Sequence, residues 1–396
     1  MNAILSEARS LAAWMSGIRR DIHRHPELGF AEERTASLIE RALDEIGVRH
    51  ERSAGTGVVA LMDGEGEGAS GCVGLRADMD ALPIQDAKDG DLSSQVDGVM
   101  HACGHDAHVA CLLGAARLIS SRRGEFAGSV KLIFQPAEET DTGGALPMIL
   151  EGALDSPNVD ALLGLHVDPG IPAGTISVAD GFINAASDMF DVVISGGGGH
   201  GAYPHKTSDV LYIACQCVSS LQSIVSRSVS PTEPAVVTVG ALRAGSVRNV
   251  IPTEASFSGI IRTLDPGVRE LVVRRLGDVI RGTCAALGGS VSIAIKPGYP
   301  MLRNDDGMAG FVRRTARGVI GEDKVLLGTP GLGVEDFAYF AERRPSCFFN
   351  LGVRNEERGI IHPLHSERFD VDESALPVGA ALLASAAMRY SGRRAG

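Results

Sequence analysis

Three short apolar segments of the chain are each followed directly by side chains that can bind metals or carry protons. The segments cover residues 73–77, 130–134 and 161–165, and the side chains after them are Asp78 with Asp80, Glu138 with Glu139, and His166. Helical patterns at 31–46 and 107–120 alternate with these strand-like segments. This alternation is typical of an α/β domain with a mostly parallel sheet. Because open sheets of this type bind ligands beyond the carboxyl ends of their strands, the pattern also predicts where a site lies.

A second pattern occupies the middle of the chain, and a length of 396 residues is compatible with two domains. Between residues 187 and 296 the expected order is strand, helix, strand, strand, helix, strand. This βαββαβ order is the ferredoxin-like split βαβ pattern. We therefore expect a domain of residues 187–296, inserted into a catalytic α/β domain made of residues 1–186 and 297–396. Its sheet would keep edge strands that can pair about a two-fold axis, as in a dimer.

The stretch from Met100 to His108 reads MHACGHDAH and holds three histidines, a cysteine and an aspartate. So many soft and borderline ligands in nine residues indicate a metal site. Cys103 and His105 are two residues apart and can face one ion, and Gly104 between them allows close backbone approach. The remaining ligands must come from elsewhere in the chain. The candidates are the side chains at the strand ends, together with His362 and His365.

Each strand-end side chain has an ordinary structural explanation when it is taken alone. Asp78 and Asp80 could cap a helix, and His166 could be a core histidine. Their coincidence at successive strand ends favours a common site. The adjacent carboxylates of Glu138 and Glu139 add something that a purely structural metal site does not need, because one can hold a metal while the other moves protons.

Composition and charge exclude several functional classes. The formal net charge of -12 argues against a nucleic-acid partner, and no apolar run is long enough for a membrane span. Glu7 and Arg9 interrupt the apolar N-terminal stretch, which is unlike a secretory signal, so we expect a cytoplasmic protein. Seven cysteines scattered along the chain do not suggest a disulfide framework. Cys103 is therefore expected to be a free thiol.

Nine motifs in order along the chain resemble the metallo-aminoacylase and carboxypeptidase superfamily. The resemblance is strongest to its amidohydrolase branch, which contains hippurate hydrolase and the plant hydrolases of indole-acetyl amino acids. The motifs are HRHPEL (23–28), GLRADMDALPIQ (74–85), MHACGHDAH (100–108), FQPAEE (134–139), GLHV (164–167), HGAYPH (200–205), NVIP (249–252), EDFAYF (335–340) and PLHSERF (363–369).

This resemblance implies a pair of divalent metal ions in each subunit. Cys103 would bridge the ions as a thiolate, His105 and Glu139 would complete one ion, and His166 and His365 the other. A thiolate with imidazoles favours zinc, while the carboxylate leaves manganese, nickel or cobalt open. The implied reaction is hydrolysis of the amide of a small N-acyl amino acid, giving a carboxylate and a free amino acid.

The resemblance also implies roles for residues that do not bind metal. Glu138 would be the general base, and Asp80 would orient a histidine ligand. Asp78 stands where related branches have a histidine ligand. Asp78 and Asp80 therefore have different expected roles.

Further roles are implied for the inserted domain, which would act as a lid and as the contact of a homodimer or tetramer. His200 would stabilise the oxyanion in the neighbouring subunit, and Asn249 and Arg262 would bind the carboxylate of the substrate. The chain departs from the usual family pattern at Val210 and Val334, which we expect beside the substrate cleft.

Three alternatives remain open at this stage. A metallo-dipeptidase or carboxypeptidase would use the same machinery on a peptide. A cysteine hydrolase would use Cys103 as nucleophile and His105 as base, although a nucleophilic cysteine has no use for Glu138 and Glu139. A non-catalytic binding protein would keep the fold, but no ligand and no base is lost from this sequence.

Overall fold

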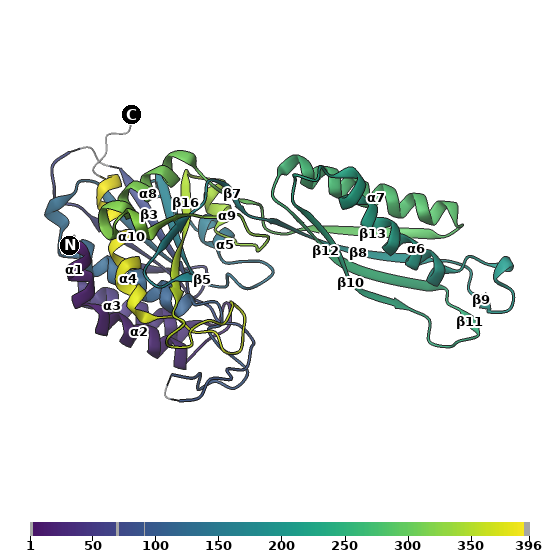
Figure 1. Cartoon of the computed structure of the whole chain (residues 1–396), viewed down its shortest axis with the longest axis horizontal. Coiled ribbons are helices and arrows are strands. Elements are labelled where there is room, and N and C mark those ends of the chain that lie inside the picture. The colour runs from purple at the N-terminus through teal and green to yellow at the C-terminus, as the bar shows by residue number, and fades with distance from the viewer. Residues whose placement is uncertain (1–2, 69–70, 91, 392–396) are drawn as a thin grey trace. The chain divides into compact units, whose positions relative to one another are not determined.

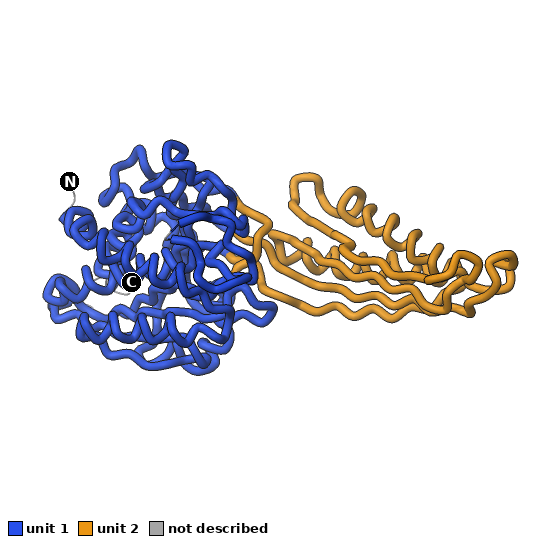
Figure 2. The backbone as a smooth tube through the Cα atoms, turned by 90° about the horizontal axis from the view of Figure 1, so that it is seen from below, with its two compact units in different colours: residues 1–181, 303–329, 336–396 blue, residues 182–302, 330–335 orange. Residues whose placement is uncertain are grey.

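The computed structural model describes residues 3–68, 71–90 and 92–391. The chain forms two compact units, which Figure 2 shows in blue and orange. Unit 1 consists of Met1–Gly181, Arg303–Thr329 and Asp336–Gly396, and unit 2 of Phe182–Leu302 and Pro330–Glu335. None of the helices in the described ranges combines the length and the apolar character that crossing a bilayer requires.

Unit 2 extends beyond the expected range of 187–296 at both ends and includes a separate segment, 330–335. Hydrogen bonds within unit 2 explain the extra segment: the Gly331 amide donates to the Ile183 carbonyl at 2.8 Å, and the Ala185 amide donates to the Gly333 carbonyl at 2.9 Å. Sequence periodicity does not reveal contacts of this kind, because neither partner lies in a long regular element.

Unit 1 is built on an eight-stranded sheet with the order β1-β2-β4-β3-β5-β16-β6-β15. The four central strands β4, β3, β5 and β16 run parallel, whereas β1 and β2 are antiparallel on one side and β6 pairs antiparallel with β16 on the other. The expected α/β fold with a mostly parallel sheet is therefore confirmed. The strands are β1 (Arg49–Ser53), β2 (Gly57–Asp63), β3 (Cys72–Asp78), β4 (Ser129–Gln135), β5 (Ala161–Pro172), β6 (Ile176–Val178), β15 (Val325–Leu327) and β16 (Ser346–Arg354).

Helices cover both faces of this sheet, with α4 and α10 on one face and α5 and α9 on the other (Figure 1). Helix α4 is the centre of the core, since fourteen of its sixteen residues are buried. A Cβ atom at Gly114 would lie 2.4 Å from Met15 Sδ and 2.9 Å from Ala380 Cβ, so only glycine allows α2 and α10 to pack this closely on α4. The helices are α1 (Ala3–Ser10), α2 (Ala12–Arg24), α3 (Glu33–Ile46), α4 (His105–Ser120), α5 (Ala145–Leu150), α8 (Asp306–Ile320), α9 (Ala338–Ala341) and α10 (Leu376–Ser391).

Unit 2 has the expected βαββαβ order and the strand order β10-β12-β8-β13, with every neighbouring pair antiparallel. Asp209 and Asp265 cap its two helices by accepting hydrogen bonds from the Tyr212 and Val268 amides. The apolar sides of both helices pack on one face of the sheet and form a separate core. The main elements are β8 (Ala186–Ser195), α6 (Val210–Ser223), β10 (Ala235–Ala244), β12 (Glu254–Thr263), α7 (Pro266–Ala286) and β13 (Ser290–Pro297).

Four short strands complete the fold. β9 (Gly199–His200) and β11 (Val250–Ile251) pair antiparallel as a small ribbon in unit 2. The other two are β7 (Gly181–Asn184) and β14 (Leu302–Asn304).

Candidate metal centre and active site

The turn that begins α4 presents Cys103 and His105 to one cluster. Gly104 has φ +88°, and a Cβ atom there would lie 2.4 Å from Val167 Cγ2. Any other residue would be both strained and too large. This glycine therefore brings the turn directly against β5 next to His166.

His166 lies inside β5 rather than at its end, because the strand continues to Pro172. The pairing of β5 with β3 nevertheless stops at Gly164. Beyond Gly164, β5 no longer pairs with β3 but still pairs with β16, and His166 lies opposite Asn350 of β16. The side of His166 toward β3 is thus clear of a strand, which leaves room for the ligand cluster.

The structure brings all five expected metal ligands together in unit 1. Cys103 Sγ is 3.4 Å from His166 Nε2, and Glu139 Oε1 is 3.3 Å from His365 Nε2. His105 Nε2 is 3.9 Å from Glu139 Oε1. Ligands on one tetrahedral zinc ion are about 3.3 to 3.6 Å apart when metal–ligand bonds are about 2.0 to 2.3 Å. The donor atoms are therefore spaced as ligands of shared ions.

The donor atoms of these ligands fall into overlapping groups. Atoms within 4.8 Å of one another form a group of Cys103, His105 and His166, a group of Cys103, Glu139 and His365, and a group of His105, Glu138 and Glu139. Cys103 belongs to the first two groups, as a bridging ligand would. The expected sharing of one ion by His105 and Glu139, and of the other by His166 and His365, stays a prediction. The candidate His362 belongs to none of these groups among the described residues.

The cluster has the electrostatics of a cation site. Burial raises the pKa of the Cys103 thiol well above its usual range, and the carboxylate of Glu139 raises it further. Burial alone would lower the pKa of His105, but Asp78 and other carboxylates raise it to about 10. A divalent cation would supply the missing positive charge and allow the thiol to ionise.

Two buried atoms of the cluster also lack a hydrogen-bond partner within the described residues, namely His105 Nε2 and Glu139 Oε1. Buried polar atoms usually have a hydrogen-bond partner, so the lack of one for these two atoms needs an explanation. The donor set of thiolate, imidazole and carboxylate fits a transition-metal ion, and the residues present therefore fit the implied metal pair.

Asp80 fixes the geometry of ligands in both groups. Its Oδ1 accepts from His105 Nδ1 at 3.1 Å, and its Oδ2 accepts from the Glu139 backbone amide at 2.9 Å. The first bond keeps the proton of His105 on Nδ1 and leaves Nε2 as a metal ligand. Asp80 is buried and acts on the ligands without joining either group.

Asp78 has a different role, which the sequence did not reveal. It forms a buried ion pair with Arg76 and accepts a hydrogen bond from His108 Nδ1, and Arg76 together with His105 and His108 lowers its pKa against the effect of burial. His108 Nε2 in turn accepts from the Val167 amide at 2.9 Å. Asp78 therefore supports the backbone next to His166. The position of His108 three residues after His105, on the same side of α4, was the available signal.

Glu138 and Glu139 follow a strained turn at the end of β4. Ala137 has φ +55°, an unfavourable value for a residue with a Cβ atom. Its amide donates to Glu32 Oε1 at 2.8 Å, which holds the turn in place. The turn leaves Glu138 buried and close to both His105 and Glu139, within the same 4.8 Å limit. A carboxylate beside the ligands, in addition to the one among them, is suited to proton transfer.

The three functional residues expected in unit 2, the oxyanion donor His200 and the substrate-binding Asn249 and Arg262, do not lie together. His200 in β9 pairs with Val250 in β11, and the Gly201 amide donates to the Asn249 carbonyl at 2.8 Å, so His200 and Asn249 are neighbours and both are exposed. Arg262 lies at the opposite end of β12, where it pairs with Ser187 and donates to its hydroxyl at 2.9 Å. Burial lowers the pKa of Arg262.

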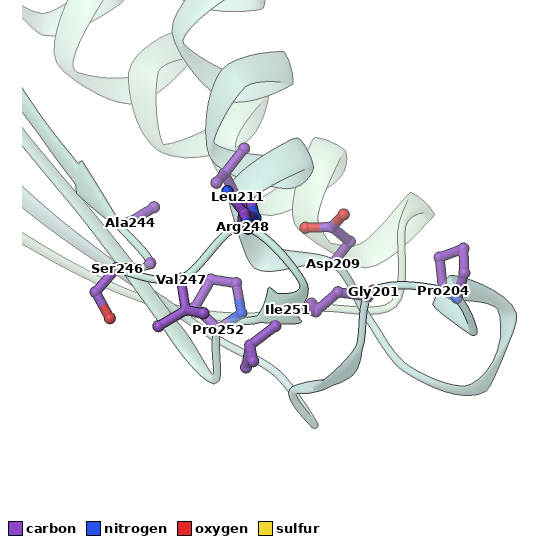
Figure 3. A pocket seen from close by; sticks show the side chains of 12 residues that line it. Gly201, Pro204, Asp209, Leu211, Ala244, Ser246, Val247, Arg248, Ile251 and Pro252 are labelled. Atoms are coloured by element: carbon purple, nitrogen blue, oxygen red, sulfur yellow. The ribbon is translucent and has the colours of Figure 1, made fainter.

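A pocket of about 580 Å³ opens beside the β9–β11 ribbon (Figure 3). Asp209, Leu211, Val247 and Arg248 contribute side chains to it. The neighbouring Val210 does not line it, because Val210 is the first residue of α6 and is fully buried in the core of unit 2. The expectation that Val210 lies beside a substrate cleft stays a prediction.

Comparison with known proteins agrees with this site. Residues 74–389 match the model of peptidase family M20/M25/M40. Thermostable carboxypeptidase 2 of Saccharolobus solfataricus is 36% identical over 98% of this chain and 98% of its own length. The N-acetyl-L-cysteine deacetylase of Bacillus subtilis is 39% identical over 93% of this chain and 86% of its own length.

A solved structure is similar over almost the whole chain. The Bacillus subtilis YXEP protein, described as a dinuclear metal-binding peptidase of the M20 family, superposes with a TM-score of 0.85 and 33% identity. The match covers 97% of this chain and 99% of that one. With candidate metal ligands and a neighbouring carboxylate at the ends of a mostly parallel sheet, the chain is a hydrolytic enzyme that belongs to peptidase family M20/M25/M40.

Proposed function

We propose that the protein uses two divalent metal ions per subunit to hydrolyse the amide bond of a small N-acyl amino acid. The observation that carries this proposal is the convergence of Cys103, His105, Glu139, His166 and His365 with the additional carboxylate of Glu138 beside them. The deacetylase relative supports an N-acyl amino acid as substrate. Zinc, manganese, nickel and cobalt are the candidate ions.

Metal ions bound by these five ligands would lower the pKa of a water molecule enough to activate it at neutral pH. Glu138 takes the proton of the attacking water and delivers it to the leaving nitrogen. Asp80 keeps His105 and the Glu139 backbone in place during these steps. The products are a carboxylate and a free amino acid.

We further propose that the enzyme works as a homodimer, in which His200 donates to the oxyanion in the neighbouring subunit. Strand β12 begins at Glu254, close to the β9–β11 ribbon. Arg262 is eight residues further along β12, which corresponds to a distance of roughly 26 Å. An N-acyl amino acid is much shorter. If His200, Asn249 and Arg262 all contact one substrate, they must come from two copies of the chain.

Exposed apolar side chains near the ribbon support a contact in this part of unit 2. They are Tyr203, Leu211, Tyr212, Val247 and Val250. A cluster of exposed apolar side chains is typical of a protein interface. Unit 2 also keeps two edge strands, β10 and β13, which a second copy can extend.

A carboxypeptidase is the second candidate, because the Saccharolobus relative carries that name. The same metal centre would then cleave a peptide. A cysteine hydrolase fits less well: His166 lies 3.4 Å from Cys103, but burial raises the pKa of that thiol, whereas a nucleophilic cysteine needs a lowered one.

The test is hydrolysis of acetyl-, benzoyl- and indole-acetyl-amino acids and of dipeptides by metal-free protein, before and after each metal is added. We expect no turnover without metal and selective hydrolysis of acyl amino acids with it. Faster hydrolysis of the dipeptides would favour the carboxypeptidase. Full activity without metal, lost on thiol alkylation, would favour a cysteine nucleophile.

A further inference from the structure

A buried group of charges surrounds Asp106, the residue that follows the metal ligand His105. Asp106 Oδ2 accepts from Arg19 Nε at 2.8 Å and from His23 Nδ1 at 2.7 Å. Arg19, His23 and Asp106 are all at most 1% exposed. His23 is the first residue of the HRHPEL motif, to which the proposed reaction assigns no role. Since Arg19 and His23 are both on α2, this helix is fixed to the first turn of α4.

Lys88 extends this group toward a second segment of the metal centre. Its Nζ donates to the Phe369 carbonyl at 2.6 Å and lies 3.0 Å from His23 Nε2. Asp86 Oδ2 is 3.7 Å from the same Nζ. A lysine ammonium has three donors, and here it has three oxygen or nitrogen partners around it. With His23 Nδ1 donating to Asp106, Nε2 is free to accept from Lys88.

The Phe369 carbonyl belongs to the loop that carries His365. His365 has φ +62°, and its amide donates to the Ala102 carbonyl at 2.8 Å. The Ala87 amide donates to the Glu367 carbonyl at 2.9 Å. The segment before Lys88 and the loop 365–370 are therefore joined at two points, one through the backbone and one through the Lys88 side chain.

We propose that Lys88 is a positioning residue for metal binding, which ties the loop of His365 to the turn of α4 that carries His105. This inference rests on the proposed metal centre. The chain of contacts runs from the Phe369 carbonyl through Lys88 and His23 to Asp106. Because Lys88 contacts the loop of His365 directly, whereas it reaches the turn of α4 only through His23 and Asp106, its effect falls mainly on the ion that His365 would bind.

The test compares Lys88→Met with Lys131→Met in the full-length protein. Lys131 is a matched control, because it is a buried lysine of the same unit whose Nζ also donates to main-chain carbonyls, those of Asp155 and Pro157. Zinc affinity is measured by competition with a chromophoric chelator, and cobalt absorption is followed as one and then two equivalents are added. Thermal unfolding of the metal-free proteins reports on folding.

We expect Lys88→Met to lower the affinity for one of the two zinc ions by about 10-fold or more. The same variant should change the cobalt spectrum of the corresponding equivalent. Lys131→Met should leave both ions unchanged, and Lys88→Arg should restore binding, because it keeps a donor for the Phe369 carbonyl. If Lys88→Met does not fold, Lys88→Gln replaces it in the comparison. Unchanged zinc affinity in Lys88→Met, or an equal loss of affinity for both zinc ions, would overturn the proposal.

The same measurements separate this proposal from the proposed reaction. Wild-type protein that binds two zinc ions but hydrolyses no acyl amino acid would contradict the reaction alone, and the effect of Lys88→Met on affinity would still be decisive. Wild-type protein that binds no zinc, cobalt or manganese would overturn both.

Discussion

Replacing Asp80 with asparagine should weaken metal binding as well as the fold. The carboxylate now accepts two hydrogen bonds, from His105 Nδ1 and from the Glu139 amide, one on each oxygen. Asparagine has nearly the same shape, but one of its two terminal atoms is a donor. One of the two present donors must then face another donor inside the protein.

The magnitude follows from these two contacts. A buried donor without an acceptor costs about 1 to 3 kcal/mol, so the free energy of unfolding of the metal-free protein should fall by about that amount. If the amide nitrogen faces His105, the ring proton moves to Nε2 and that atom can no longer bind a metal. If it faces the Glu139 amide, the other ligand group is displaced. Either outcome should lower metal affinity by about 10- to 100-fold.

The assay combines chelator competition with urea unfolding, and Asp372→Asn provides the control. Asp372 is also a buried carboxylate of unit 1, where it accepts from the Ser374 amide at 3.0 Å and from the Asn355 side chain. We expect both variants to lose stability, but only Asp80→Asn to lose metal affinity. Wild-type metal affinity in Asp80→Asn would refute the role given to Asp80.

Three further predictions concern the reaction. Glu138→Gln should keep both metals but lose turnover, whereas Glu139→Gln should lose metal, as metal analysis beside an activity assay would show; metal loss from Glu138→Gln instead would reverse the two roles. Arg262→Ala should raise KM for acyl amino acids more than for the corresponding amides, by about 1.5 to 3 kcal/mol of binding energy, and equal effects would exclude a contact with the carboxylate. His200→Ala should lower kcat by about 10² to 10³. A mixture of His200→Ala and Glu138→Gln proteins with demonstrated subunit exchange should regain activity, whereas a mixture that stays inactive would place His200 in its own subunit's site.

The sequence predicted the centre of the fold better than its margins. The central strands follow apolar runs that are buried on both faces, such as Cys72–Asp78, in which every residue is buried. Strand β1 has a weaker pattern, because it alternates between exposed and half-buried residues until Ser53, whereas β2 is mostly buried like the central strands. Neither strand was identified from the sequence. The boundary of unit 2 at 330–335 depends on hydrogen bonds between distant segments, which periodicity does not encode.

The site could be predicted as a set of residues but not as an arrangement. The ligand-rich stretch 100–108 identified Cys103 and His105, and the strand ends identified Glu138, Glu139 and His166 as candidates. Their grouping depends on the turn at Gly104 and on the positive φ of His365, which set the side-chain directions. Spacing along the chain contains neither quantity.

The end of β3 links the two ligand groups, and this explains why its two aspartates have separate roles. Asp78 supports His166 through His108 and the Val167 amide. Asp80 contacts His105 directly and holds Glu139 by its backbone. Both aspartates therefore act on the group of His105 and His166, but only Asp80 also reaches the group of Glu139 and His365. It follows that substitution of Asp80 should weaken the binding of both metal ions, whereas substitution of Asp78 should act mainly through His166 and substitution of Lys88 mainly through His365.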